Sequence, residues 1–251
     1  MSKENAARFF ALLAAERPDP TTELDYINPY TLLVAVVLSA QATDVSVNKA
    51  TVELFKVVDT PEKMVALGEA KLRDTIRTIG LYRTKAANVI RLSQILIEKH
   101  GGTVPANREA LEALPGVGRK TANVVLNVAF GQPTIAVDTH IFRLANRTRL
   151  APGKDPRAVE HALEQVVPEK YLRHAHHWLI LHGRYVCTAR NPKCTACVVN
   201  ELCLYEGKTT LAEPVKAKVS PARRPSNRGR ASSSPATGRR APRRARTPGA
   251  T

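Results

Sequence analysis

The four cysteines of this chain lie together near its C-terminal end and could form a metal site. Cys187, Cys194, Cys197 and Cys203 have the spacing C-x6-C-x2-C-x5-C. Four thiolates this close in sequence can surround one soft metal centre. A disulfide framework is not expected, because the reductants inside cells keep thiols reduced. The spacing alone leaves three alternatives open: a tetrahedral zinc site, an iron–sulfur cluster, or unrelated buried thiols.

A second group of interest is the segment LPGVGRKT, residues 114–121. Gly116 and Gly118 permit positive φ and a close approach of the backbone to another molecule. The apolar run 122–129 follows, so a helix should begin here and present free N–H groups that can bind a phosphate oxygen. An ordinary tight turn between helices has the same pattern. A dinucleotide-binding loop is not expected, because no strand precedes the segment and a third glycine is absent.

Lys120 falls in the first turn of this expected helix, next to Arg119. The helix dipole and the arginine both disfavour the ammonium form of its amine. A neutral lysine amine is a nucleophile that can form a Schiff base. By position alone, however, Lys120 would be an ordinary solvated surface residue, which is what a lysine near a helix start usually is.

Asp138 follows eighteen residues after Lys120 and precedes a second apolar helical run. Its simplest role is to cap that helix. A carboxylate at a helix N-terminus stays ionised, so it could also orient or deprotonate an amine and stabilise developing positive charge. His140, Arg143 and Arg147 come next and are either phosphate contacts or solvated residues.

The elements that must hold these residues are predicted to be helices. The chain has 251 residues, of which 43% are hydrophobic and only 5% aromatic, a composition that favours packed helices over a sandwich of short strands. Apolar residues recur with helical spacing, and no convincing strand pair is present. Pro18 should end the first helix, Gly101 should end a helix near His100, and Asn107 should cap a short helix.

The net charge is +16 and points to a polyanion as partner. Residues 214–251 contain eleven Lys or Arg, no Asp or Glu and six Pro, so we expect this tail to be disordered. Subtracting its eleven charges from +16 leaves +5 for residues 1–213. The tail is either an extension without a dedicated task or an arm that raises DNA affinity by releasing counterions.

The sequence gives no reason to expect membrane insertion. Its longest apolar stretch, 32–38, is far shorter than the roughly 20 residues that span a bilayer. The N-terminus carries acidic residues and lacks a cleavable apolar segment. We therefore expect an intracellular, cytoplasmic protein. The histidines at 174, 176, 177 and 182 have no acidic partners nearby and are expected to be solvated or hydrogen-bonded, not metal ligands.

Several segments together resemble the helix-hairpin-helix DNA glycosylases of the endonuclease III type. They are LSAQATDVSVNKAT at 38–51, TIGLYRTKAANVI at 78–90, LPGVGRKTANVVL at 114–126, TIAVDTHIFRLANR at 134–147 and HHWLILHGRYVC at 176–187. The resemblance covers nearly everything up to about residue 205. It implies an all-α fold with one domain at 22–132 and a second formed by 1–21 and 133–213, with DNA bound between them.

The resemblance also implies an activity and a cofactor. Lys120 matches the nucleophile of enzymes that remove a damaged base and then cut the strand, and Asp138 matches their catalytic aspartate. The substrate would be double-stranded DNA with oxidised pyrimidines or abasic sites, and the protein would be a monomer associated with the nucleoid. The cysteine spacing matches the family's structural [4Fe–4S] loop.

An enzyme that acts on a stacked nucleotide must rotate it out of the duplex and fill the gap. Gln41 and Leu81 match the positions that do so in this family, although by themselves they are a loop amide and a core leucine. Asp44 is expected in the lesion pocket unless it or Thr43 merely caps a helix. Arg190 and Lys193, between two of the cysteines, are expected to contact phosphates.

Two other functions remain open. An adenine-mismatch glycosylase shares the hairpin and the cysteine spacing, but it normally lacks a lysine at position 120 and carries a folded C-terminal domain. A helix-hairpin-helix protein that only binds DNA is the second alternative.

Overall fold

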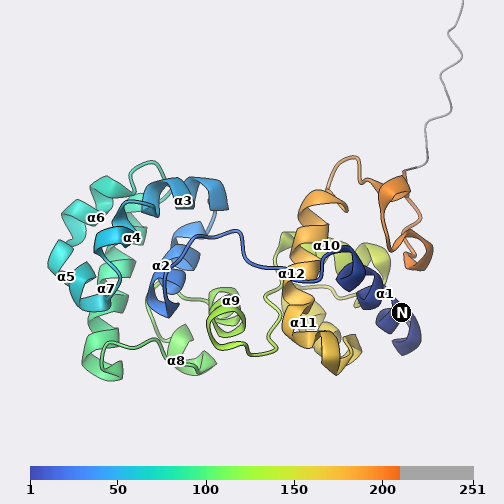
Figure 1. Cartoon of the computed structure of the whole chain (residues 1–251), viewed down its shortest axis with the longest axis horizontal. Coiled ribbons are helices and arrows are strands. Elements are labelled where there is room, and N and C mark those ends of the chain that lie inside the picture. Colours follow the sequence, from blue (N-terminus) through green and yellow to red (C-terminus); the bar gives the residue numbers. More distant parts are fainter. Residues whose placement is uncertain (210–251) are drawn as a thin grey trace, which may run out of the picture. The chain divides into compact units, whose positions relative to one another are not determined.

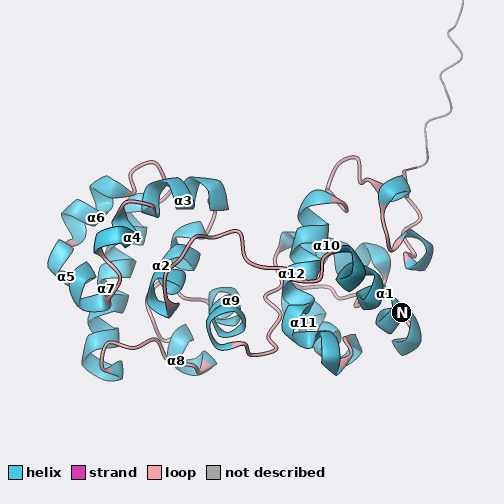
Figure 2. Ribbon diagram, in the orientation of Figure 1, coloured by secondary structure: helices cyan, strands magenta, loops and turns pink. Residues whose placement is uncertain are grey.

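The computed structural model describes residues 1–209, which fold as helices joined by loops, with no strand in that range (Figures 1 and 2). The all-α prediction is therefore confirmed for this part of the chain. The predicted disordered tail, 214–251, lies outside the described residues.

The helices are α1 (Lys3–Glu16), α2 (Pro29–Ser39), α3 (Asp44–Thr51), α4 (Leu54–Val57), α5 (Pro61–Leu67), α6 (Glu69–Thr75), α7 (Tyr82–His100), α8 (Arg108–Glu112), α9 (Arg119–Phe130), α10 (Thr139–Thr148), α11 (Pro156–Val166) and α12 (Glu169–Tyr185), followed by the short 3-10 helices η1 (Cys194–Ala196) and η2 (Asn200–Leu202).

The helix ends follow the signals in the sequence. The α1 helix ends at Glu16, just before Pro18, and α7 ends at His100 with Gly101 in the left-handed conformation at φ 58°. Asn107 caps α8 by accepting a hydrogen bond from the N–H of Ala110. These three predictions are confirmed, because local backbone and side-chain chemistry is enough to stop or start a helix.

A first hydrophobic cluster is built around α2. The apolar stretch 32–38 is buried along its whole length, which is why it shows no polar face. The helices α3 to α9 and the loops between them contribute the other members of this cluster, among them Met64, Leu72, Val89 and Leu126.

A second hydrophobic cluster joins the N-terminal helix to the C-terminal ones. Phe9 and Phe10 of α1 are fully buried against residues of α10, α11 and α12. Trp178 of α12 donates from Nε1 to the carbonyl of Arg17 at 2.7 Å, so the chain beyond α1 is also held there. Figure 1 shows α1 next to α10 and α12. Residues 1–209 nevertheless belong to one compact unit, and the predicted domain boundaries stay a prediction.

None of the helices within residues 1–209 is long and apolar enough to cross a membrane.

Candidate active site and cysteine loop

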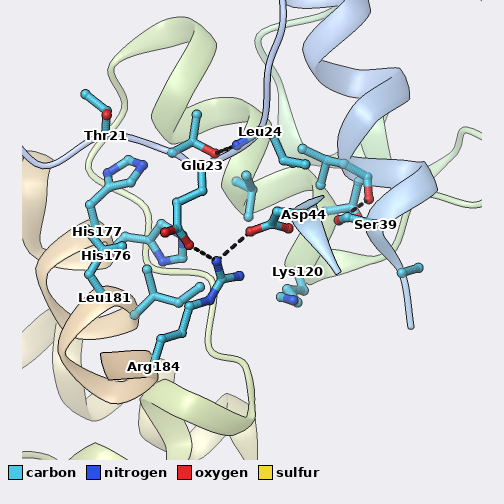
Figure 3. Close-up of a pocket in the computed structure, with 16 residues that line it drawn as sticks. Thr21, Glu23, Leu24, Ser39, Asp44, Lys120, His176, His177, Leu181 and Arg184 are labelled. Atoms are coloured by element: carbon cyan, nitrogen blue, oxygen red, sulfur yellow. Dashed lines mark hydrogen bonds and ion pairs between the residues drawn. The ribbon is translucent and has the colours of Figure 1, made fainter. Parts of the chain in front are cut away.

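A pocket brings together five segments that are far apart in the sequence. Its lining comes from the linker after α1, the end of α2, and the starts of α3 and α9, and it is completed by one face of α12. Lys120, Asp44, Glu23, His176 and Arg184 are its charged or titratable members, together with His177 (Figure 3).

Lys120 is the second residue of α9, lines this pocket and is exposed. Among the described residues it has no ion-pair partner, so its amine is available to a ligand in the pocket. Arg119, in contrast, forms an ion pair with Glu160. From the sequence, the positive charge of Arg119 is expected to disfavour the ammonium form of Lys120. In the structure, Glu160 compensates that charge.

The hairpin before Lys120 uses its two glycines differently. Gly116 has φ 78°, a conformation that favours glycine, and a Cβ at this position would also lie in tight contact, 3.0 Å, with the side-chain amide nitrogen of Asn88. Gly118 has φ −99°, which any residue can adopt, so only Gly116 uses the positive φ that glycine permits. Gly118 is the N-cap of α9 and offers no side chain, which leaves the first N–H groups of the helix free for a phosphate.

Asp138 caps α10, as its simplest role requires. Its Oδ1 accepts hydrogen bonds from the N–H groups of His140 at 2.9 Å and Ile141 at 2.8 Å. The carboxylate is half-buried and does not line the pocket with Lys120. The structure contains no ion pair between Lys120 and Asp138 in the range 1–209, so a direct interaction between them stays a prediction.

Asp44 lines the pocket but is not free there. Arg184 of α12 contacts the carboxylates of both Asp44 and Glu23 (Figure 3). Tyr185 donates its hydroxyl to Glu23. Thr43, not Asp44, is the N-cap of α3. Two carboxylates and one guanidinium leave one net negative charge near Lys120, which favours a cationic intermediate.

Glu23 and Arg184 were not predicted as site residues. No local pattern marks a glutamate in a linker or an arginine on an amphipathic helix as a pocket residue. Arg184 lies in the segment HGRYVC, but only its pairing with Asp44, 140 residues away, reveals its place.

Three histidines of α12, His176, His177 and His182, are buried, and His174 is half-buried. His176 is 3% exposed, and its Nδ1 has no hydrogen-bond partner within the described chain. Burial lowers the pKa of His176 well below its ordinary value, with smaller contributions from His177, Lys120 and Arg184. His176 is therefore a neutral imidazole in the pocket wall.

The two predicted wedge residues, Gln41 and Leu81, are exposed, and both have left-handed backbones. Leu81 is 60% exposed, so the alternative of a core leucine is wrong. Both sit in short loops that precede a helix, α3 for Gln41 and α7 for Leu81.

The predicted phosphate contacts fall into two groups. Arg190 and Lys193 are exposed, and His140 lines a second hollow with Asp44 and Tyr185. Arg119 and Arg143 instead hold parts of the protein together: Arg143 donates from Nη2 to Gly183 O at 2.6 Å and from Nε to Cys187 O at 3.0 Å. The structure thus shows internal contacts for these two, and their roles on DNA stay predictions.

All four cysteines line one hollow beside α12. None forms a disulfide, and burial raises the pKa of the Cys197 thiol to about 11, so a cationic centre is needed to hold the thiolates. The four thiols surround a common hollow, an arrangement that suits a metal centre held by cysteine thiolates.

Two arginines hold the cysteine loop in place. Arg147 donates to Thr188 O at 2.7 Å and to Ala189 O at 2.9 Å, and Arg143 binds Cys187 O. These bonds fix the backbone at the first cysteine.

Comparisons with known proteins agree with the geometry. Residues 34–169 match the family model of the HhH-GPD superfamily of base excision DNA repair proteins, and residues 187–203 match that of the iron–sulfur binding domain of endonuclease III. The second match spans all four cysteines, and the [4Fe–4S] cofactor is thus confirmed.

Curated relatives extend the similarity to almost all of the described chain. The chain is 56% identical to endonuclease III of Escherichia coli (strain K12) over 211 residues, which are 84% of this chain and 100% of the relative. It is 57% identical to endonuclease III of Haemophilus influenzae over 208 residues, covering 83% and 99% of the two chains.

Solved structures give the same result. The chain is similar to a trapped covalent intermediate of endonuclease III with DNA, with 44% identity, a TM-score of 0.76, and coverage of 81% of this chain and 96% of the other. A non-covalent endonuclease III–DNA complex matches with the same values. The chain therefore belongs to the endonuclease III family of HhH-GPD base excision DNA repair proteins.

Proposed function

We propose that the chain removes damaged bases, chiefly oxidised pyrimidines, from double-stranded DNA and then cuts the strand, with Lys120 as the nucleophile. The observation that carries the assignment to Lys120 is its place at the start of α9. There the amine lines a pocket, has no ion-pair partner in residues 1–209, and lies next to the free N–H groups of the hairpin helix.

The chemistry needs one amine and one proton acceptor. The neutral Lys120 nitrogen bonds to C1′ of the nucleotide, the N-glycosidic bond breaks, and the base leaves with that electron pair and takes up a proton. Opening of the sugar ring gives a Schiff base between Lys120 and C1′. Loss of a proton from C2′ then breaks the C3′–oxygen bond, which cuts the strand by β-elimination.

Asp138 and the pocket carboxylates supply the matching electrostatics. Asp138 Oδ1 accepts two backbone hydrogen bonds that fix the carboxylate at the start of α10, and a carboxylate there can stabilise positive charge on the sugar or receive a proton from Lys120. The net negative charge of Glu23, Asp44 and Arg184 acts in the same direction from the pocket wall.

DNA recognition is assigned to exposed residues around the pocket. Gln41 and Leu81 fill the gap left by the flipped nucleotide, Asp44 contacts the lesion, and the free N–H groups after Gly118 bind a phosphate. Arg190 and Lys193 contact the DNA backbone from the cysteine loop, and His140 and Arg143 contact it from α10. We further propose a monomer in the cytoplasm that associates with the nucleoid, with DNA lying between a domain of residues 22–132 and one of residues 1–21 and 133–213.

The cluster has a structural role in this proposal. Cys187, Cys194, Cys197 and Cys203 would hold it, and when bound it supplies four covalent ties within one loop. The loop held by these four cysteines would then keep Arg190 and Lys193 on a rigid backbone.

Borohydride trapping tests the proposal. Reduction in the presence of duplex DNA with an abasic site should link the protein covalently to DNA. Lys120→Gln should abolish the link while keeping the fold, and Lys71→Gln, which changes an exposed lysine on α6, should keep it. If the unaltered protein gave no covalent product, a protein that only binds DNA would be the better assignment. Excision of adenine from mismatches in preference to oxidised pyrimidines would favour the mismatch glycosylase.

A further inference from the structure

Arg119, the residue directly before Lys120, is engaged by a buried carboxylate on another helix. Its Nε lies 3.1 Å and 3.0 Å from the two carboxylate oxygens of Glu160, and its Nη2 lies 2.9 Å from Oε1. The side chain of Glu160, on α11, is only 6% exposed, whereas that of Arg119 is 36% exposed. The contact therefore uses one edge of the guanidinium in a two-pronged geometry, which fixes its direction as well as its distance.

Asn123 extends this contact toward Asp138. Its Nδ2 donates to Glu160 Oε1 at 3.0 Å and to the backbone carbonyl of Ile135 at 3.3 Å, and the backbone carbonyl of Asn123 accepts a hydrogen bond from Thr134 Oγ1 at 2.6 Å. Asn123 is fully buried. The residue three positions after Lys120 is thus tied to the residue three positions before Asp138.

The pattern continues along one face of α9. Arg119, Asn123 and Asn127 are spaced by four residues and share a face of the helix. The Nδ2 of Asn127 donates to the carbonyls of Gln132, Thr134 and Arg173. Other residues of α9, such as Ala122 and Val125, pack in the first hydrophobic cluster. The helix that carries Lys120 is therefore apolar toward one cluster and polar toward the segments that precede α10 and form α11 and α12.

We propose that Arg119 and Glu160 are positioning residues, which hold the start of α9, and with it Lys120, in register with the segment that leads into Asp138. The proposal rests on the assignment of Lys120 as nucleophile. It replaces the expectation that Arg119 mainly binds DNA. If Arg119 turned to a phosphate, Glu160 would keep a buried charge without its cationic partner, which is strongly unfavourable.

The two roles of Arg119 predict different behaviour in Arg119→Ala and Glu160→Gln. A positioning role makes the variants alike: each should lower the single-turnover rate of base excision at saturating DNA by about tenfold to about a hundredfold, the range expected for a misplaced nucleophile. Affinity for a duplex with an uncleavable abasic-site analogue should change by less than about twofold, because a positioning residue does not touch DNA. The double variant should be no slower than the slower single variant, since both remove the same contact.

The experiment measures the single-turnover excision rate and the affinity for the duplex with the abasic-site analogue, each at two salt concentrations. The proteins compared are the unaltered protein, both single variants and the double variant. Arg91→Ala is the matched control, because it also removes one arginine charge but from an exposed ion pair on α7. Melting temperature and visible absorbance of the cluster report the fold. Glu160→Gln is isosteric and keeps an acceptor for Asn123, and Arg119→Lys keeps the charge without the two-pronged contact. These variants keep the test decisive if Arg119→Ala does not fold.

Two results would overturn the positioning role. In the first, Arg119→Ala binds DNA more weakly and the slope of its log affinity against log salt concentration falls by about 1, while Glu160→Gln excises the base at the normal rate. This combination would identify Arg119 as a phosphate contact. The other is a normal rate in both variants. Failure of the nucleophile assignment is separate, because it would appear as borohydride trapping that persists in Lys120→Gln.

Discussion

Gln41 and Leu81 both have left-handed backbones, with φ 54° and 60°, and their loops lie next to each other. A Cβ placed on Gly80, the neighbour of Leu81, would lie 4.0 Å from the carbonyl oxygen of Gln41. Non-glycine residues avoid this conformation because it costs about 1–2 kcal/mol each. Two such residues side by side, both exposed, indicate that the backbone is held so that these side chains project outward.

Leu81→Gly separates the conformational cost from the function of the side chain. Glycine removes the left-handed penalty of about 1–2 kcal/mol but adds a backbone-entropy cost of about 0.5–1 kcal/mol, so the free energy of unfolding should stay equal or rise by up to about 1.5 kcal/mol. Excision from duplex DNA should slow, because nothing fills the gap. Leu81→Ala should slow excision equally without the gain in stability. Denaturant unfolding and single-turnover excision give both quantities, and a normal excision rate in both variants would remove Leu81 as a wedge.

His177 should make the protein less stable in mild acid. Burial, assisted by His174, lowers the pKa of His177 from its ordinary value of 6.5 to about 4. Below pH 6.5 the unfolded chain therefore binds a proton that the folded protein excludes until about pH 4, and stability falls as the pH drops through this range. The loss should reach at most about 3 kcal/mol.

Replacing this histidine tests that explanation. His177→Gln should lose less stability between pH 7.5 and pH 5 than the unaltered protein, whatever its absolute stability, as followed by chemical unfolding. His161→Gln is the control, because the side chain of His161 is 77% exposed. Equal pH dependence in His177→Gln and the unaltered protein would contradict the buried neutral form.

The metal content of the cysteine loop should be iron with acid-labile sulfide and almost no zinc. Arg147→Ala removes two hydrogen bonds from a charged donor to the loop carbonyls, each worth roughly 1.5–3 kcal/mol. The visible absorbance of the cluster should therefore decay several-fold faster in a chelator. Arg157→Ala, an exposed residue of α11, should decay like the unaltered protein. Zinc as the main metal would refute the cluster.

Deleting residues 214–251 should weaken DNA binding and reduce its salt dependence, because eleven cations are removed. Each phosphate contact contributes about 0.9 to the slope of log affinity against log salt. A tail of equal length with its Lys and Arg changed to Gln should behave like the deletion. Affinities and slopes that do not change would show that the tail is unused in DNA binding.

The sequence by itself determined the features that depend on neighbouring residues. Pro18, Gly101 and Asn107 set helix ends, and Asp138 was expected as a cap, because each acts on the backbone within a few positions. The spacing of the cysteines identified a metal site for the same reason. The segments around Lys120 identified the family.

Only the tertiary structure decided which distant groups meet. Arg119 was expected on DNA but binds Glu160, 41 residues away, and Arg184 binds Asp44, 140 residues away. The left-handed, exposed backbone of Leu81 and the buried imidazole of His176 were likewise not evident. The physical reason is that the partner and burial of a long polar side chain depend on the packing of whole helices, which local patterns do not encode.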